Sequence, residues 1–298
     1  MRIDKLGEFG LIKRITRQIK TDDSVIKGSG DDCAVIKFDR HNYQLLTCDM
    51  IVAGVDFKPD DKPYLIGRKA LAISLSDIAA CAGWPRYALV SLGIPKHTRV
   101  RAVDQICKGF FDLAREFRVN IVGGDISLSR DLILEVSVVG AVEKKYLVLR
   151  SGAKPGDIIF VTGSLGDSIL GKHLRFSPRI KEARFLVKNF KVNAMIDISD
   201  GLTQDLGHIL EESKVGALIY ADLIPRYKPT TSLENALYAG EDFELLFTLP
   251  IKEARRLMAK KYNDFHPIGQ IVEKKQGLRL IDKNCRERAI KPEGYKHF

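Results

Sequence analysis

The sequence lacks the features that define several large classes of protein. Its five cysteines include no C-x-x-C pair, which argues against a zinc site or a dithiol redox centre, and their odd number fits a reducing compartment. No apolar run approaches the roughly 18–20 residues that a membrane-spanning helix needs. The charged stretch Met1–Lys5 lacks the apolar core of a signal peptide. We therefore expect a cytoplasmic protein without a membrane partner.

The common nucleotide and metal motifs are missing as well. The segment from Gly166 to His173 approaches G-x-x-x-x-G-K-[ST], but it ends in histidine and lacks the hydroxyl that would bind Mg²⁺. We interpret this segment as a loop that enters a helix. No G-x-G-x-x-G follows an expected strand, there is no H-R-D catalytic loop, and the six histidines form no H-E-x-x-H pair. Each histidine is therefore expected to be structural or exposed.

Acidic residues are fewer than basic ones, and the formal net charge is +10. The excess is concentrated in residues 251–298, which hold 13 Lys/Arg against 6 Asp/Glu. No aromatic residues are interleaved with these charges in the way that base stacking would require. A solvated basic surface is the first interpretation, attraction of an anionic substrate the second, and nucleic-acid binding the last. We expect no nucleic-acid partner.

The composition is that of a globular protein, and the order of elements suggests two halves. The chain has 298 residues, of which 45% are hydrophobic and 29% charged. A polar, turn-rich stretch, Arg150–Asp157, separates two series of strands and helices. We place the boundary just before it, between domains of residues 1–145 and 146–298. Strict β-α-β alternation is absent, which favours an α+β fold with helices on one face of each sheet over a doubly wound parallel sheet.

Hydrophobic periodicity predicts the elements of both halves. In the first half we expect strands at 33–38, 43–49, 87–94, 119–123 and 132–142, helices at 8–20 and 63–81, and a further helix that Thr98 caps and that carries Val103, Ile106, Phe110 and Phe117. In the second half we expect strands at 158–162, 194–197, 216–221, 244–249, 266–272 and 277–281, and helices at 166–174, 181–189, 201–213 and 251–261.

Aspartates recur where expected strands begin or end. They stand in Gly30-Asp31-Asp32, Thr47-Cys48-Asp49, Gly123-Gly124-Asp125 and Asp197-Ile198-Ser199-Asp200-Gly201, and Asp77 lies within the expected helix from 63. A single aspartate of this kind is usually a helix cap or a turn residue. Several together are harder to explain by packing, because burying an unpaired carboxylate is costly. Carboxylate oxygens suit Mg²⁺, which binds substrate phosphates at the same time, so the set points to phosphoryl transfer.

Taken in order, these segments resemble the thiamine-monophosphate kinase family, in the superfamily of aminoimidazole ribonucleotide synthetase and selenophosphate synthetase. The matching segments are Gly7–Ile12, Gly30–Ala34, Thr47–Asp49, Lys69–Ala80, Gly123–Asp125, Arg150–Ala153, Val161–Ser168, Met195–Gly201, Gly240–Phe247 and Gly294–Phe298. They cover essentially the whole chain, and their order makes the likeness specific although each motif alone is weak.

The resemblance implies a reaction, a fold and an assembly. ATP would phosphorylate thiamine monophosphate to thiamine diphosphate by direct in-line transfer, with several Mg²⁺ ions, K⁺ as an optional further ion, and no covalent enzyme intermediate. Two α/β-sandwich-like halves would form the chain. The N-terminal sheet domain would bind ATP and Mg²⁺ and pair in a homodimer, and the C-terminal domain would have a mixed sheet. The active site would lie in the cleft between the halves.

The resemblance also implies the site residues. The metal positions are Asp32, Thr47, Cys48, Asp49, Asp77, Asp125, Asp197 and Asp200; the ATP positions are Gly124, Asp125, Arg150 and Ser199; the substrate positions are Asp56, Glu241 and Tyr295. No catalytic side chain is expected beyond these ligands. Side-chain chemistry agrees, because Arg150 can grip phosphate with a bidentate fork and Tyr295 can stack on a flat heteroaromatic ring.

Three features depart from the family pattern. Cys48 stands where the family has a hydroxyl residue, although its backbone carbonyl could still bind a metal. Asp56 stands where the family has a histidine that contacts substrate. Its carboxylate would repel a phosphate by about 1–4 kcal/mol, pair with the cationic thiazolium, or bind another Mg²⁺. The segment between Ser168 and Met195 is short, so the lid over the nucleotide is expected to differ.

Two alternatives stay open. One is a related ATP-dependent enzyme with another acceptor, although selenophosphate synthetase is disfavoured because no reactive cysteine precedes Cys33. The other is a non-catalytic paralogue that binds nucleotide or nucleic acid. The basic C-terminal segment and Asp56 favour this second alternative, and the complete set of aspartates opposes it.

Overall fold

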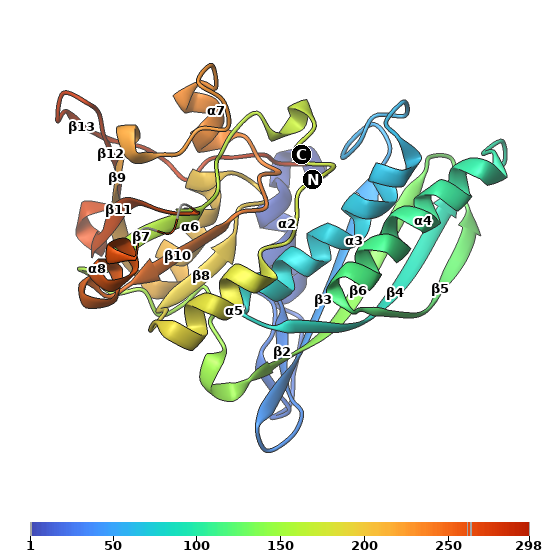
Figure 1. Ribbon diagram of the computed structural model, residues 1–298, viewed down its shortest axis with the longest axis horizontal. Helices are drawn as coiled ribbons and strands as arrows, with labels where there is room; N and C mark the ends of the chain where they lie inside the picture. The colour runs from blue at the N-terminus through green and yellow to red at the C-terminus, as the bar shows by residue number, and fades with distance from the viewer. Residues whose placement is uncertain (1, 261, 263, 298) are drawn as a thin grey trace.

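The computed structural model describes residues 2–260, 262 and 264–297. These residues form two β-sheets, one in each half of the chain, with helices packed against them (Figure 1). Both sheets mix parallel and antiparallel strands, so the α+β prediction is confirmed. No helix in the described part of the chain combines the length and the apolar character that a membrane crossing requires.

The N-terminal sheet has the strand order β1-β2-β3-β6-β4-β5. Its strands are β1 (Val25–Lys27), β2 (Ala34–Lys37), β3 (Asn42–Val52), β4 (Trp84–Ile94), β5 (Asn120–Leu128) and β6 (Ile133–Glu143). Neighbours are antiparallel except β4 and β5, which run parallel. A parallel pair needs a crossover connection, and helix α4 (Val100–Phe117) provides it.

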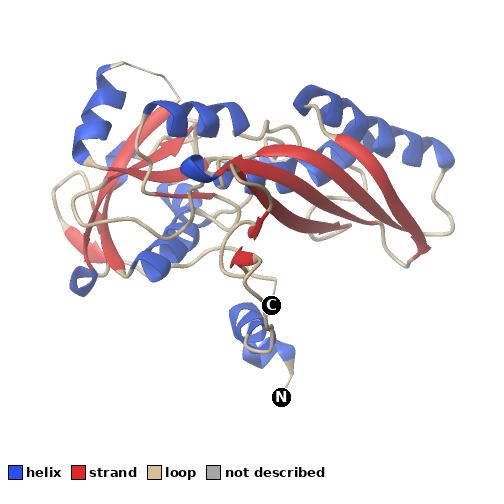
Figure 2. Cartoon of the chain, turned by 90° about the horizontal axis from the view of Figure 1, so that it is seen from below, coloured by secondary structure: helices blue, strands red, loops and turns tan. Residues whose placement is uncertain are grey.

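Helix α4 and helix α3 (Pro63–Ala80) cover one side of this sheet (Figure 2). Two glycines allow the helices to touch backbone to backbone. A Cβ on Gly67 would lie 1.9 Å from the Ile106 carbonyl oxygen, and one on Gly109 would lie 2.0 Å from the Tyr64 carbonyl oxygen. Because α3 lies between α4, the sheet and helix α5 (Ile180–Asn189), most of its residues are buried. Polar residues on α3 are therefore carried into the interior.

The other side of the N-terminal sheet is open. Strand β5 forms its edge, and residues 122–128 are all exposed. Apolar side chains elsewhere on this face are exposed as well, with Met50 of β3 at 59% and Leu89 of β4 at 47% of full exposure. A sheet with one apolar open face and an unpaired edge offers a surface that another chain can cover.

The C-terminal sheet has the strand order β13-β12-β9-β11-β7-β10-β8. Its strands are β7 (Ile158–Thr162), β8 (Ala194–Asp197), β9 (Val215–Tyr220), β10 (Leu245–Leu249), β11 (Phe265–Glu273), β12 (Leu278–Ile281) and β13 (Glu287–Ala289). With it lie α5, α6 (Leu202–Ser213), α7 (Leu233–Tyr238) and α8 (Ile251–Ala259). One apolar core runs from α3 through α5 to Phe160 and Phe247 of this sheet, so the two halves share buried surface.

Several local predictions were wrong. The expected helix at 166–174 is a single short 3₁₀ turn, Ser168–Leu170, flanked by Asp167 and Gly171 at positive φ, which no longer helix accommodates. Thr98 does not cap α4, whose N-cap is Arg99 with no side-chain hydrogen bond. The short elements β1, α7 and β13 were missed, since each has too few residues for periodicity to register.

The chain ends meet beside the C-terminal half. The helix expected at 8–20 corresponds to α2 (Glu8–Thr16), which ends earlier, and the short helix α1 (Ile3–Leu6) precedes it. The His297 backbone N–H donates to the Glu8 carboxylate at 3.0 Å, and Figure 2 shows the C-terminus next to this helical segment. Two predictions end on residues that the structure does not describe. The helix expected at 251–261 ends at Lys261, whereas α8 ends at Ala259, and the matching segment Gly294–Phe298 ends at Phe298.

Candidate active site

Three carboxylates from distant parts of the chain meet where α3 contacts β8. Asp32 precedes β2, Asp77 lies on α3 and Asp197 ends β8. One oxygen atom from each lies within 4.8 Å of the other two. The Ser76 hydroxyl donates to the Asp197 carboxylate at 2.6 Å, which joins α3 to β8 at this point. The structure therefore brings together ligand positions from both halves of the chain.

Thr47 and Asp49 of β3 extend this carboxylate cluster. Strand alternation turns both side chains toward α3, and the Thr47 hydroxyl donates to the Asp77 carboxylate. One oxygen of Asp49 and one of Asp32 are buried without a hydrogen-bond partner among the described residues. Such oxygens are costly to bury unless a cation compensates them.

Burial raises the pKa of the clustered carboxyls. It is the largest cause for Asp32, Asp49 and Asp77, and it raises the pKa of Asp197 to about 8. For Asp77 the next causes are repulsion from Asp49 and Asp197. Burial, followed by the nearby charge of Glu8, raises the pKa of Asp200 to about 6. The protein itself thus supplies too little positive charge to balance this site.

The donor set fits Mg²⁺. Its members, Asp32, Thr47, Asp49, Asp77 and Asp197, offer only hard oxygen atoms, and two of those atoms lack any other partner in the described chain. Mg²⁺ prefers carboxylate and hydroxyl oxygens and retains positions for water and phosphate. A divalent cation would also offset the repulsion that raises the pKa values of these carboxyls.

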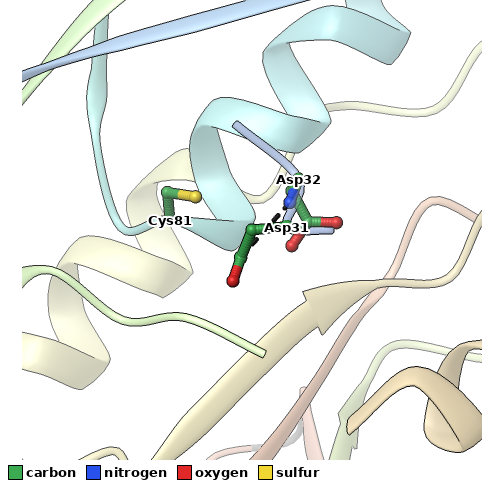
Figure 3. A group of neighbouring side chains, drawn as sticks. All are labelled: Asp31, Asp32 and Cys81. Carbon is green, nitrogen blue, oxygen red and sulfur yellow. Dashed lines mark hydrogen bonds between the residues drawn. The ribbon is translucent and has the colours of Figure 1, made fainter. Parts of the chain in front are cut away.

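Arg150 connects this cluster to the polar segment between the sheets. Its guanidinium donates to the Asp32 carboxylate at 2.7 Å, and its backbone N–H donates to the Asp31 carboxylate at 3.2 Å. Figure 3 shows Asp31 and Asp32 beside Cys81 at the end of α3, with the Asp32 backbone N–H bonded to the Asp31 carboxylate. Asp31 thus fixes the backbone on which Arg150 stands, a role that the sequence did not reveal.

Three loops meet next to the cluster and carry the remaining candidate residues. The Glu241 backbone N–H donates to the Ser199 carbonyl at 2.7 Å, and the Tyr295 backbone N–H donates to the Asp200 carbonyl at 2.9 Å. Gly240 allows the first contact, because a Cβ there would lie 2.5 Å from the Ser199 carbonyl oxygen. The structure therefore places Ser199, Asp200, Glu241 and Tyr295 together.

A pocket of about 530 Å³ opens among these loops. Its lining includes Asp49, Asp200 and Glu241 together with apolar side chains from both halves, and Asp56 and Tyr295 line it as well. The Asp56 carboxylate accepts the Val52 backbone N–H at 2.7 Å, which holds it in the turn after β3. The proposed substrate positions thus share one cavity, and that cavity adjoins the carboxylate cluster through Asp49.

Gly124, Asp125 and the Cys48 side chain are not part of this assembly. Asp125 lies on the exposed edge strand β5, opposite Ser91, which in turn lies opposite Glu135 on the open face of the sheet. Cys48 is exposed and points away from Thr47 and Asp49, so only its backbone could contact a metal at the cluster. A Cβ on Gly124 would lie 1.8 Å from the Val90 carbonyl oxygen, which gives this glycine a packing role.

Three further residues belong to the site that sequence reasoning did not single out. Lys69 is a buried lysine in the pocket wall, Glu8 lies close enough to affect Asp200, and Asp205 accepts the backbone N–H groups of Asp200 and Gly201 at 3.1 and 3.0 Å. The signal for Lys69 was a charged residue directly before the mainly apolar stretch Ala70–Leu75 of the expected helix. Glu8 and Asp205 carried no comparable signal.

Comparison with known proteins first defines the class. Residues 30–142 match the model of the AIR synthase related protein N-terminal domain, and residues 154–281 match that of the AIR synthase related protein C-terminal domain. Solved structures of the hydrogenase maturation protein HypE share the fold, with TM-scores of 0.71–0.76 at 16–20% identity. The chain therefore belongs to the class of AIR synthase related proteins, whose two domain models together cover most of its length.

Comparison with individual proteins narrows the class to one family. The thiamine-monophosphate kinase of Buchnera aphidicola (subsp. Schizaphis graminum) is 36% identical over 98% of this chain and 99% of its own length. That of Bacillus subtilis is 34% identical over 98% and 100%. The solved structure of AaThiL complexed with AMPPCP and TMP has a TM-score of 0.87 at 32% identity, covering 100% of this chain and 99% of its own. The chain belongs to the thiamine-monophosphate kinase family.

Proposed function

We propose that this protein transfers the γ-phosphoryl group of ATP to the phosphate of thiamine monophosphate, forming ADP and thiamine diphosphate by direct in-line attack. The observation that carries the proposal is the cluster of Asp32, Asp77 and Asp197, which adjoins, through Asp49, a pocket large enough for a small heteroaromatic acceptor. Membership of the family supports the same reaction, and AaThiL has been solved with an ATP analogue, AMPPCP, and with TMP.

Catalysis would rest on positioning and charge. Mg²⁺ held by Asp32, Thr47, Asp49, Asp77 and Asp197 would neutralise phosphate charge as it develops. No side chain needs to become covalently attached, because a phosphate oxygen of the acceptor is itself the nucleophile. The cluster draws ligands from β3, α3 and β8, so the same contacts would fix the two halves relative to each other. K⁺ remains an optional further ion of the proposal.

The nucleotide would approach from the side of Arg150. In the structure its guanidinium pairs with the Asp32 carboxylate, so it already stands beside the metal position. A guanidinium can hold a phosphate in two parallel hydrogen bonds, and it stays charged at any physiological pH. Ser199, at the junction of the three loops, would provide a hydroxyl contact to the nucleotide from the edge of the acceptor pocket. We propose both as ATP contacts.

The acceptor would occupy the 530 Å³ pocket with its phosphate toward the cluster. Glu241 and Asp56 place negative charge in the pocket wall, which suits the cationic thiazolium ring. Tyr295, at 44% exposure, can stack on a ring of the acceptor. Since one Asp56 oxygen is engaged by the Val52 backbone, the carboxylate is held at the wall. We therefore propose that the Asp56 carboxylate contacts the cationic thiazolium ring and not the phosphate, whose negative charge it would repel.

We further propose a homodimer that pairs through the N-terminal domain, residues 1–145, and a separate C-terminal domain, residues 146–298. Asp125 lies on the face of the sheet opposite to Asp49, across three strand spacings of about 4.8 Å each from β3. One chain therefore cannot bring the Asp125 carboxylate to its own cluster. A second copy on the open face could supply it. A soluble dimer in the cytoplasm is the form that we expect to be active.

The deciding experiment is a coupled ADP-release assay with ATP, Mg²⁺ and thiamine monophosphate. We expect turnover that depends on both substrates and on Mg²⁺. Asp49→Ala and Asp125→Ala should each abolish turnover and leave the fold intact by circular dichroism. Turnover with a different phosphorylated acceptor, and none with thiamine monophosphate, would refute the acceptor. ATP binding without any turnover would refute the enzyme.

A further inference from the structure

Lys69 is a buried cation in the wall of the pocket that we assign to the acceptor. Only 1% of its surface is exposed, and it is among the largest fully buried side chains in the described chain. Lysine is rarely buried to this extent unless its ammonium is paired and hydrogen-bonded. Because α3 is packed against α4, α5 and the sheet, the Lys69 side chain cannot reach bulk solvent along the surface of its own helix. Its partners therefore define its role.

The Lys69 ammonium joins two loops from different halves of the chain. It donates to the Asp56 backbone carbonyl at 2.6 Å, in the turn after β3, and it forms an ion pair with the Glu241 carboxylate. Glu241 has a backbone φ of 66°, a conformation that a residue with a side chain adopts only where contacts enforce it. The direction of its carboxylate is then set by Lys69 at one end and by the Ser199 contact at the other.

The charge pattern argues against direct contact between Lys69 and a cationic ring. Among the described residues that line the pocket, Lys69 is the one lysine or arginine, facing the carboxylates of Asp49, Asp56, Asp200 and Glu241. A free ammonium would repel the ring. Paired with Glu241, its charge is largely neutralised at short range, and the outer face of that carboxylate stays available to the acceptor.

We propose that Lys69 is a positioning residue for the acceptor, which it serves by holding the Glu241 carboxylate and the Asp56 turn on either side of the pocket. This inference rests on the proposed function, because it assumes that the pocket receives thiamine monophosphate. It adds a residue that acts through Glu241 and that contacts neither ATP nor the metal ligands.

The first test compares Lys69→Met with Lys69→Arg. Methionine keeps the length and apolar stem but removes the charge, whereas arginine keeps the charge and its donors. Steady-state kinetics should show that Lys69→Met raises the KM for thiamine monophosphate roughly tenfold or more and changes the KM for ATP by less than about twofold. Lys69→Arg should recover part of the acceptor KM. Lys181→Met, on the exposed surface of α5, is the matched control and should leave both values unchanged.

The second test is a double-mutant cycle with Glu241→Gln. If Lys69 acts through Glu241, Lys69→Met should raise the acceptor KM by less than about twofold in the Glu241→Gln background. Full additivity of the two effects would overturn the proposal, because it would mean that Lys69 does not act on the acceptor through Glu241. Calorimetric titration of thiamine monophosphate without ATP should show the same pattern in Kd.

A purely structural role would give different results. Equal increases in both KM values, or a lower Tm with unchanged acceptor KM, would refute the positioning role. If Lys69→Met does not fold, Lys69→Gln and the Glu241→Gln single variant carry the same comparison. Wild-type protein is assayed first: absence of turnover with thiamine monophosphate would refute the proposed function, whereas normal wild-type turnover with an unaffected Lys69→Met would refute this inference alone.

Discussion

Asp197→Asn should stabilise the metal-free protein while it abolishes activity. Asp197 is 3% exposed, and burial together with the charge of Asp32 raises its pKa to about 8. The folded protein must therefore take up a proton there at neutral pH that the unfolded chain does not bind. Each pH unit between the unfolded and folded pKa costs about 1.4 kcal/mol of stability. Asparagine removes this cost and keeps an acceptor for the Ser76 hydroxyl, which donates to the present carboxylate at 2.6 Å.

We expect a gain on the order of 1–3 kcal/mol, less than the full linkage value because the asparagine NH₂ group is itself buried and needs a hydrogen-bond partner. For a chain of this length such a gain raises the Tm by roughly 2–8 °C. The assay is thermal unfolding by circular dichroism at pH 7.5 in EDTA, with Asp222→Asn, an exposed aspartate, as the control.

Addition of Mg²⁺ and ATP completes the experiment. The Tm of the wild type should rise, because ligands that bind only the folded state stabilise it, and Asp197→Asn should show little of this rise and at least about 100-fold lower turnover. A variant that is less stable than wild type in EDTA would show that the buried Asp197 carboxyl is not a net cost to the metal-free fold. A full Mg²⁺-dependent rise in the variant would remove Asp197 from the ligand set.

Three other outcomes follow from the same structure. In EDTA, the cost that the raised pKa values of Asp200, about 6, and Asp197, about 8, impose on folding should be absent below about pH 4 and should grow as pH rises toward 8, because the folded state binds more protons at these two groups over that window. Unfolding scans should therefore show that the stability gained by Asp197→Asn increases with pH and that Mg²⁺ flattens the wild-type trend; a gain that does not increase with pH would contradict this reasoning. Gly109→Ala should lower the free energy of unfolding by about 1–3 kcal/mol in urea titrations, because the added Cβ would lie 2.0 Å from the Tyr64 carbonyl oxygen. An unchanged unfolding midpoint would mean that α3 and α4 can move apart at no cost in stability. Arg150→Lys should raise the KM for ATP roughly tenfold, because an ammonium group cannot form the bidentate hydrogen bonds that a guanidinium makes with phosphate. A KM for ATP within about twofold of the wild-type value would argue against that contact.

Regular elements with a strong pattern were predictable from the sequence. The expected helix at 63–81 corresponds to α3 (Pro63–Ala80), and the expected strands at 158–162 and 194–197 correspond to β7 and β8. Proline at the first helical position marked the start of α3, and the apolar residues that recur along the segment supported a long helix. The helix expected at 166–174 had periodicity, but two positive-φ residues break it, and backbone conformation of that kind is set by the packing of neighbouring loops.

The candidate site was predictable as a set of residue types and not as an arrangement. Aspartates beside glycines at strand ends suggested metal ligands without any structure, and Asp32, Asp77 and Asp197 do lie together. Their shared position had no local signal, because it depends on α3 of one half packing against β8 of the other. The same reasoning assigned Asp125 to the site, whereas the strand order places it on an exposed edge.

The sequence by itself determined which chemistry this protein can perform, because hard oxygen ligands and an arginine suit phosphates whatever the fold. Tertiary structure alone decided which of these groups act together. Register in β3 turns Thr47 and Asp49 toward α3 and Cys48 away from it, and the junction of the loops at Ser199, Gly240 and Tyr295 builds the pocket. Burial then sets the charge requirement of the site. Carboxylates that are stable as anions in water become costly to keep ionised when they are buried, so the cluster requires a cation.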